Sequence, residues 1–579
     1  MKHLVKFGKV KPILFHGKLI SIKVTLTVKG YKGKTIIFKD SMLLIPQSLR
    51  QLCDSFKVDN KKGIFPILLN DINYKGPLPD YELFKSISKN EYLMLKDQFV
   101  KKMWSFKDEA IKYCKLDCIS LYQVLTKFNE LIYNEFKVDP SKALTLPSLA
   151  MRIYKTLYLP NYHSTNQFTV YQLNGLPEHN IRQSYTGGAV DVYIPQNKDN
   201  EILYLYDVNN LYPSVMLNKP MPIGQPVAFL GDIRKVNVNA FGFFYCKITS
   251  PEYLEHPILQ RTIKISNGLR TIAGLGSWMG WVFSEEMDNA MKYGYTFEIL
   301  HGYQFEKGYI YKDYITKMYD LRLQYPKGEA MNLNAKLLMN SLYGKFGMKS
   351  DTTKIEIISI KDLNKYLEKF NTNIADIIYL EDHIVVTINT NEFIPSSDIL
   401  YYDSEITNQM DVNIAIASAI TAYGRIHMSQ FKNNPNYKLY YSDTDCAVLN
   451  TLLPAELVGP GLGQMKLEHV ITKGIFLAPK VYALITNQGE QIIKAKGLNK
   501  DVIQDINMAD FEFLLSKDSS KILKQSKLSK SLYNSDIELI NTIYTLKVTS
   551  NKRQNIYIKG IFDSTKPLNY NNLSPSGFR

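Results

Sequence analysis

YSDTDC, residues 441–446, places two carboxylates two positions apart between short apolar stretches at 439–441 and 447–449. These stretches predict the two arms of a hairpin, with Asp443 and Asp445 at its tip. The carboxylates repel each other unless a cation neutralises them. With a third acid from another strand they could hold two Mg²⁺ ions about 3.5–4 Å apart. Taken alone, the stretch could equally be a solvated acidic turn.

A further carboxylate lies upstream, at the end of an apolar stretch. Residues 201–206 predict a strand that ends at Asp207, and the turn after it presents the ring of Tyr212. Taken alone, this pattern could be an aspartate that caps a strand beside a core tyrosine.

Residues 332–345 predict a helix with one polar face. Lys336, Asn340 and Tyr343 are spaced i, i+4 and i+7, so a cation, an amide and a phenol lie on that face. Such a row suits the phosphates, sugar and base of one nucleotide, although an amphipathic surface helix would look the same. The opposite face carries an apolar stripe, formed by Ala335, Leu338 and Leu342.

In this order the three clusters resemble motifs A, B and C of the family B DNA polymerases. Residues 207–214 resemble D-x-x-S-L-Y-P-S, with Asn210 where the family usually has Ser. Residues 336–344 resemble K-x-x-x-N-S-x-Y-G, and residues 441–445 resemble Y-x-D-T-D. The resemblance implies an α+β right-hand polymerase with palm, fingers and thumb, preceded by a partial RNase H-like 3′–5′ exonuclease domain.

The resemblance also implies a catalytic centre for nucleotidyl transfer from a dNTP to a primer 3′-hydroxyl. Asp207, Asp443 and Asp445 would be its catalytic carboxylates. Two Mg²⁺ ions, with Mn²⁺ as an alternative, would be ligated by Asp207, Asp445 and the carbonyl of Val208, while Asp443 assists nearby.

For the incoming dNTP the resemblance implies a second group of residues. Lys336 would neutralise the triphosphate, with Arg322 as a weaker candidate, and Tyr212 would stack under the deoxyribose and exclude a 2′-hydroxyl. Asn340 and Tyr343 would line the pocket of the nascent base pair.

Three further segments resemble elements of the family that bind primer-template DNA. Residues 185–188 resemble Y-x-G-G, residues 480–482 resemble K-x-Y, and residues 494–497 match a basic strand that enters the thumb. The DNA-binding residues that they imply are Tyr185, Gly187, Gly188, Lys480, Tyr482, Lys494 and Lys496.

Tyr113 and Asp117 resemble the third exonuclease motif, Y-x-x-x-D. The other two exonuclease motifs are missing: the D-x-E at 80–82 follows a Pro-rich loop, and no N-x-x-(F/Y)-D precedes Tyr113. We therefore expect an N-terminally truncated exonuclease domain without 3′–5′ exonuclease activity in this chain.

The spacing of the motifs resembles the protein-primed branch of the family, known from linear plasmids and some viruses. Asp207 and Lys336 lie 129 positions apart, and Lys336 and Asp443 lie 107 apart, which leaves room for two insertions. This branch implies a terminal protein as primer and replication of a linear plasmid. A catalytically inactive, truncated remnant that only binds DNA and an RNA-primed polymerase of the same family are the alternatives.

These resemblances and the breaker at 139–141 suggest a division of the chain. We expect a partial exonuclease domain at 1–138, a linker and palm segment at 139–260, fingers with part of an insertion at 261–349, an irregular insertion at 350–410, a second palm segment at 411–490 and a thumb at 491–579.

The composition fits a basic globular protein. The chain has 579 residues, a net charge of +15 and 45% hydrophobic residues, which indicates a full core and a polyanionic partner. Five scattered cysteines predict neither a disulfide framework nor a structural zinc site. We expect a monomer without a membrane span. Abundant Lys, Ile, Asn and Tyr indicate an AT-rich genome. The resemblance to polymerases of linear plasmids implies a mitochondrial location, with a cytoplasmic plasmid or a virus as alternatives.

Overall fold

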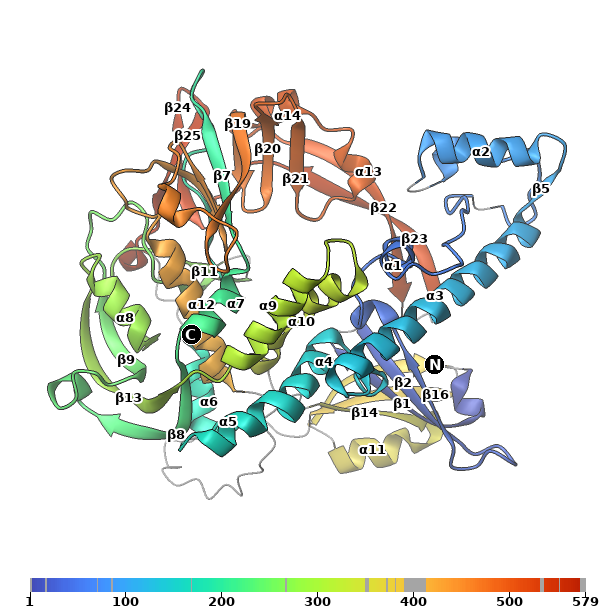
Figure 1. Ribbon diagram of the computed structural model, residues 1–579, viewed down its shortest axis with the longest axis horizontal. Coiled ribbons are helices and arrows are strands. Elements are labelled where there is room, and N and C mark those ends of the chain that lie inside the picture. Colours follow the sequence, from blue (N-terminus) through green and yellow to red (C-terminus); the bar gives the residue numbers. More distant parts are fainter. Residues whose placement is uncertain are drawn as a thin grey trace.

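The largest sheet among the described residues has seven strands in the order β21-β20-β19-β7-β18-β17-β6 (Figure 1). The computed structural model describes residues 3–15, 18–69, 71–84, 87–167, 169–265, 268–348, 353–370, 373–380, 382–389, 413–531, 536–550 and 552–572. The strands of the central sheet are β6 (Val190–Val192), β7 (Leu203–Val208), β17 (Leu439–Asp443), β18 (Cys446–Leu449), β19 (Met465–Ala478), β20 (Val481–Thr486) and β21 (Gln491–Ala495).

Helix α12 (Ile414–Ser429) supplies much of the core beside this sheet. Nearly all of its residues are buried, and the side chain of Asn413 caps it by accepting a hydrogen bond from the N–H of Ile416 at 3.2 Å. The expected hairpin at 439–449 is confirmed. Strand β21 pairs with β20, so the predicted thumb boundary at residue 490 falls inside the central sheet.

Two helices stand over the sheet at the place predicted for the fingers. Helices α9 (Lys312–Gln324) and α10 (Ala330–Phe346) pack against each other, as Figure 1 shows. Ala335, Leu338 and Leu342 of α10 are at most 1% exposed, which confirms the predicted apolar stripe.

A second sheet, of order β12-β9-β13-β8, crosses the boundary predicted at residue 260. That boundary is wrong, because β9 pairs along its length with both β12 and β13. The sheet carries helix α8 (Ser284–Met291) and the hairpin of β10 (Arg261–Ile265) and β11 (Gly268–Ile272). Its strands are β8 (Met221–Leu230), β9 (Gly242–Thr249), β12 (Ser277–Phe283) and β13 (Thr296–Gly308).

The first 140 residues combine a small sheet with a long helix. Strands β1 (Gly8–Phe15), β2 (Lys18–Leu26) and β3 (Thr35–Lys39) form an antiparallel sheet, and α3 (Phe106–Phe136) packs on α1 (Leu49–Ser55). Helix α3 ends where Lys137 adopts a left-handed conformation, φ 53°, just before the breaker predicted at 139–141.

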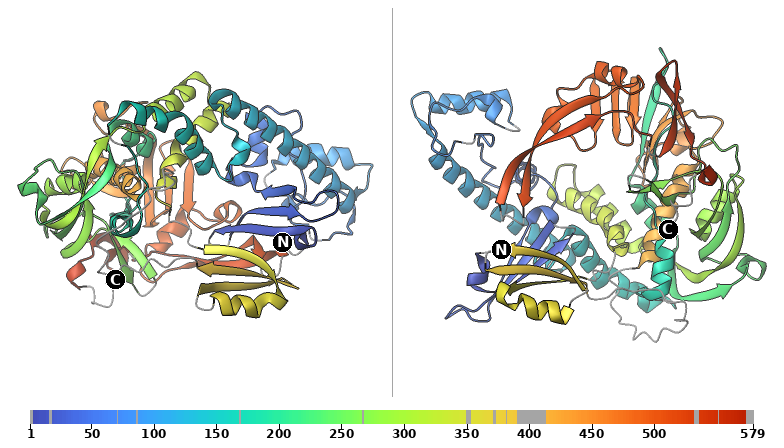
Figure 2. Two further views of the ribbon diagram at one scale, coloured as in Figure 1. Left: turned by 90° about the horizontal axis from the view of Figure 1, so that it is seen from below. Right: turned by 180° about the vertical axis from the view of Figure 1, so that it is seen from behind.

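The segment 353–389 is not irregular, contrary to the prediction for 350–410. It forms the sheet β14-β16-β15 with helix α11 (Leu363–Phe370), because its isoleucines and valines alternate and bury one face. Figure 2 shows this sheet beside the sheet of β1–β3. Its strands are β14 (Thr353–Ser359), β15 (Ile374–Leu380) and β16 (His383–Asn389). The remaining residues of the predicted insertion, 350–352, 371–372, 381 and 390–410, lie outside the described residues.

Residues 521–572 form two hairpins and then return to the second sheet. The long hairpin of β22 (Lys521–Ser531) and β23 (Asp536–Leu546) extends toward the first residues of the chain, and β24 (Arg553–Ile558) pairs with β25 (Ile561–Pro567). Tyr570 is 2% exposed and donates a hydrogen bond to the carbonyl of Ile272 at 3.0 Å. Among the described residues no helix is long and apolar enough to cross a membrane.

Candidate active site

Strand pairing brings together two of the predicted catalytic carboxylates, although 238 positions separate them. Strand β7 lies between β18 and β19, so Asp207 is paired with Cys446 on one side and Lys466 on the other. The N–H of Val208 donates to the carbonyl oxygen of Asp445 at 2.8 Å. The strand end of motif A and the hairpin turn of motif C therefore form one acidic cluster.

Each of the two turns in this cluster contains a residue in the left-handed backbone conformation. Thr444 has φ 58° and donates its N–H to the carbonyl of Ala189 at 2.8 Å. Asn210, at the start of α7 (Leu211–Asn218), has φ 51°. Asn tolerates this conformation better than most residues do, which accounts for an Asn where the family pattern has Ser.

The glycine pair of the Y-x-G-G element lies against the hairpin turn. A Cβ atom on Gly188 would lie 2.6 Å from Cγ2 of Thr444, so only glycine fits there, whereas a Cβ on Gly187 would meet nothing within 4 Å. The predicted DNA-binding segment thus directly contacts the catalytic turn.

Asp443 has a different environment from the other two carboxylates. The Lys480 ammonium donates to both of its carboxylate oxygens at 2.6 Å, and the N–H of Lys480 donates to the Tyr441 hydroxyl at 2.9 Å. Asp443 is therefore compensated by a protein cation, which leaves Asp207 and Asp445 as the carboxylates available to a metal.

The electrostatics of that pair fit divalent cations. Burial and then the nearby Asp445 and Glu468 raise the pKa of Asp207 to about 7, and burial also raises the pKa of Asp445. Within the described residues no group of three or more His, Cys, Asp or Glu side chains is arranged for a metal. Two carboxylates and the Val208 carbonyl still suit Mg²⁺, which takes few protein ligands and completes its shell with water and phosphate oxygens.

The residues predicted to bind the dNTP lie on three helices: Tyr212 on α7, Arg322 on α9, and Lys336, Asn340 and Tyr343 on α10. The rings of Tyr212 and Tyr343 lie 4.6 Å apart between centroids, and burial raises the pKa of both phenols. Lys336 is exposed and Asn340 half-buried on the same helix as Tyr343. Arg322 lies on α9, and its Nε has no hydrogen-bond partner among the described residues.

The predicted primer-binding residues surround one groove next to Asp443. Its lining includes both residues of the K-x-Y element and both lysines of the basic strand: Lys480, Tyr482, Lys494 and Lys496. Residues from two predicted motifs therefore share a surface beside the catalytic turn.

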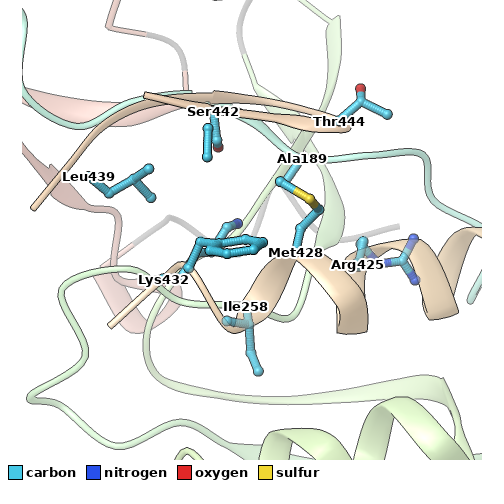
Figure 3. Close-up of a pocket in the computed structure, with 10 residues that line it drawn as sticks. Ala189, Ile258, Arg425, Met428, Lys432, Leu439, Ser442 and Thr444 are labelled. Carbon is cyan, nitrogen blue, oxygen red and sulfur yellow. The ribbon is translucent and has the colours of Figure 1, made fainter. Parts of the chain in front are cut away.

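Arg425 and Glu286 belong to the site, and the sequence did not point to either. Arg425 Nε and Nη2 donate to the two Glu286 carboxylate oxygens at 2.7 and 2.8 Å, and Nη1 donates to the Thr186 carbonyl at 2.5 Å. Figure 3 shows Arg425 on α12 at a small pocket beneath Ser442 and Thr444. Because the pair spans 139 positions, local spacing gave no signal for it.

The exonuclease-like residues form a separate cluster on α3. Asp117 and Tyr113 both contact Lys62, whose ammonium donates to the Asp117 carboxylate at 2.7 Å and to the Tyr113 hydroxyl at 2.5 Å. Asp117 therefore has a lysine as its nearest charged partner.

Comparison with known proteins agrees with these motifs. Residues 1–437 match the family described as DNA polymerase type B, organellar and viral. The chain is 33% identical to a probable DNA polymerase of Ascobolus immersus over 98% of its own length and 46% of that relative, and 34% identical to one of Neurospora intermedia over 93% and 55%. It spans about half the length of these curated relatives.

The fold is similar to that of a solved polymerase. A structure of Phi29 DNA polymerase complexed with primer-template DNA superposes with a TM-score of 0.61 at 18% identity, covering 93% of this chain and 85% of that one. The predicted right-hand architecture is thus confirmed.

Proposed function

The chain belongs to the type B DNA polymerases of organelles and viruses, and from this membership we propose that it is a DNA-directed DNA polymerase that transfers a nucleotide from a dNTP to a primer 3′-hydroxyl. The observation that carries the proposal is the meeting of Asp207, at the end of β7, with Asp445, in the turn before its neighbour β18.

Asp207, Asp445 and the Val208 carbonyl would hold two Mg²⁺ ions, or Mn²⁺ in their place. Bound there, divalent cations would lower the pKa of the primer hydroxyl and neutralise the leaving pyrophosphate. The protein's own contribution is to fix the two carboxylates: the hydrogen bond from Val208 to Asp445 and the contact of Gly188 with Thr444 hold the turn in register.

The remaining residues would bind and orient the substrates. Lys336 on the exposed face of α10 is suited to the triphosphate, and the paired rings of Tyr212 and Tyr343 are suited to the sugar and base. The groove with Lys480 and Lys494 is suited to the phosphates of the primer strand.

Primer extension on a primed single-stranded template tests this function. We expect a template-length product from the wild type with Mg²⁺ and dNTPs, and a rate lower by about three decades for Asp445→Asn, because one metal ligand is lost. A matched control is Asp505→Asn, which removes an exposed carboxylate outside the cluster. If Asp445→Asn kept more than about a tenth of the wild-type rate, its assigned role would be wrong.

Protein priming and plasmid replication in the mitochondrion extend the proposal. They are supported by the organellar and viral family and by the spacing of the motifs. The test is the transfer of a labelled dNMP to a candidate terminal protein on an unprimed plasmid end. Extension of annealed primers without any transfer to protein would favour the RNA-primed alternative.

We also propose that the chain has no 3′–5′ exonuclease activity of its own. The ion pair of Asp117 with Lys62 and the missing D-x-E strand support this. Degradation of single-stranded DNA with Mg²⁺ by the purified wild type and by the purified Asp445→Asn variant would contradict this proposal.

The alternative of an inactive remnant has a different test. A folded protein that binds DNA but extends no primer would favour that alternative.

A further inference from the structure

We propose that the sheet of β1–β3 and its β2–β3 loop form a binding surface for single-stranded nucleic acid, separate from the polymerase site. The first observation is the charge of this segment. Residues 1–39 contain ten lysines and no Asp or Glu, in a chain whose net charge is +15. A positive potential of this kind attracts polyanions.

The sheet places three of these lysines on one face. Residues of β1 and β2 alternate, so Val10, Ile22 and Val24 are buried. The residues next to them in the strands, Lys9, Lys11 and Lys23, are exposed on the opposite face. Leu4, Val5 and Ile357 of β14 pack on the buried face, so β14 contacts the side that the lysines do not use.

The lysines lie close together without a counter-charge. Lys11 is directly opposite Lys23 in the strand register, and Lys9 is opposite Thr25. Like charges in directly opposed positions destabilise a hairpin. Among the described residues no salt bridge involves these three lysines. A bound chain of phosphates would relieve the repulsion.

The β2–β3 loop adds an aromatic ring. Residues 28–34, VKGYKGK, turn through Gly30 and Gly33, both at φ 83°, and the N–H of Gly33 donates to the carbonyl of Leu26 at 2.9 Å. Tyr31 is 58% exposed, and the Lys34 ammonium lies 5.3 Å from its ring centroid. Its other neighbours in the loop, Lys29 and Lys32, are exposed too.

An exposed ring among ammonium groups favours a single strand over a duplex. Single-stranded binding proteins combine basic surfaces that follow the phosphates with aromatic rings on which bases stack. A duplex keeps its bases paired inside, so Tyr31 would have no base to stack on. Figures 1 and 2 show this sheet in a part of the molecule away from the strands β7 and β19 of the catalytic cluster.

Fluorescence anisotropy with a labelled dT20 oligonucleotide and the full chain tests the surface. The variant Lys9→Gln/Lys11→Gln/Lys23→Gln should bind about tenfold more weakly at low salt, and its log Kd should depend less on log salt by about two units of slope. The control Lys89→Gln/Lys101→Gln/Lys102→Gln removes the same charge at exposed positions on and after α2 (Lys89–Phe99). Equal losses in the two variants would overturn the proposal.

Tyr31→Ala tests the stacking. We expect about a fivefold or greater loss of dT20 affinity with no change of salt slope, because the ring contributes no charge. Irradiation of an iododeoxyuridine oligonucleotide on the wild type should crosslink the peptide that contains Tyr31. Absence of this crosslink, or tighter binding of polyglutamate than of dT20 to the lysine face, would refute a nucleic-acid surface.

The strand could be the template ahead of the primer or the strand displaced from it. Binding to a primed template with a long single-stranded overhang and to a nicked duplex with a displaced flap distinguishes them, since the lysine variant should weaken only the substrate that reaches the sheet. A variant that weakens neither contradicts the proposal. Extension on a template with a minimal overhang should stay at the wild-type rate, so the polymerase proposal is tested separately.

Discussion

The Lys480 ammonium lies 2.6 Å from each carboxylate oxygen of Asp443. The two residues come from different predicted motifs, K-x-Y and Y-x-D-T-D, and their contact links the groove lined by Lys480 and Lys494 to the hairpin turn of Asp443 and Asp445. Lys480, predicted to bind DNA, therefore also neutralises the one carboxylate of the turn that is not free for a metal.

Replacement of Lys480 should affect catalysis more than replacement of Lys494. Lys480→Met leaves Asp443 as a third uncompensated carboxylate beside Asp207 and Asp445, and we expect the single-turnover extension rate to fall about tenfold or more. Lys494→Met, in the same groove, should weaken primer binding with a smaller effect on that rate. Rapid-quench extension at saturating DNA measures the difference, and equal rates for the two variants would contradict it.

Gly188 should be intolerant of any side chain. Gly188→Ala puts a Cβ 2.6 Å from Cγ2 of Thr444, so the turn that holds Asp445 must shift and extension should fall about a hundredfold. The double variant Gly188→Ala/Thr444→Gly removes the clash and should recover part of the activity. Gly187→Ala meets no atom within 4 Å, and its free energy of unfolding in urea should stay within about 0.5 kcal/mol of the wild type.

The buried pair of Arg425 and Glu286 should be important for stability. Arg425→Met leaves the Glu286 carboxylate, which is 9% exposed, without its charged partner, and the Thr186 carbonyl loses a hydrogen bond. We therefore expect the free energy of unfolding to drop by about 3–5 kcal/mol. Arg425→Met/Glu286→Leu removes both charges and should cost less than the single variant. Urea denaturation of the single and double variants checks this, and additive losses would show that the pair is not coupled.

His256 should make the protein less stable in mild acid. Burial, and then Arg553 and Lys432, lower the pKa of His256 to about 3, whereas an unfolded histidine titrates near 6.5. Below pH 6.5 the unfolded state binds a proton that the folded state does not, so stability falls as the pH drops toward 3. At pH 5 the loss from this group should be about 2 kcal/mol.

His256→Phe provides the comparison for that prediction. The variant keeps a ring against Tyr193, 4.3 Å away between centroids, but cannot take up a proton. Urea unfolding at pH 7.5 and pH 5 should show a smaller decrease for the variant than for the wild type. Identical decreases would mean that other groups account for the acid sensitivity.

The sequence predicted those parts of the site in which short motifs carry the signal. The place of Asp207 at a strand end, the place of Asp445 in a hairpin turn and the apolar stripe on α10 could be predicted because each depends on neighbours within one strand, turn or helix. Arg425 and Glu286 were missed because their pairing depends on tertiary packing between α12 and α8. The predicted boundary at residue 260 was wrong for a related reason, because β9, which precedes residue 260, pairs with β12 and β13, which follow it.

Residues 353–389 show a different limit. Their polar, Asn- and Ile-rich composition indicated an irregular insertion, yet Ile384, Val386 and Ile388 alternate and are at most 1% exposed. The alternation of these apolar residues was present in the sequence, but the prediction followed the polar composition of the whole segment instead.

Tyr570 has a consequence for how the gene tolerates change. Its ring lies 4.9 Å from that of Trp278 between centroids, and its hydroxyl accepts a hydrogen bond from the N–H of Gly274 at 3.0 Å. A nonsense or frameshift mutation that removed only the codons from 568 onward would therefore open a core built from residues 240–299, three hundred positions upstream.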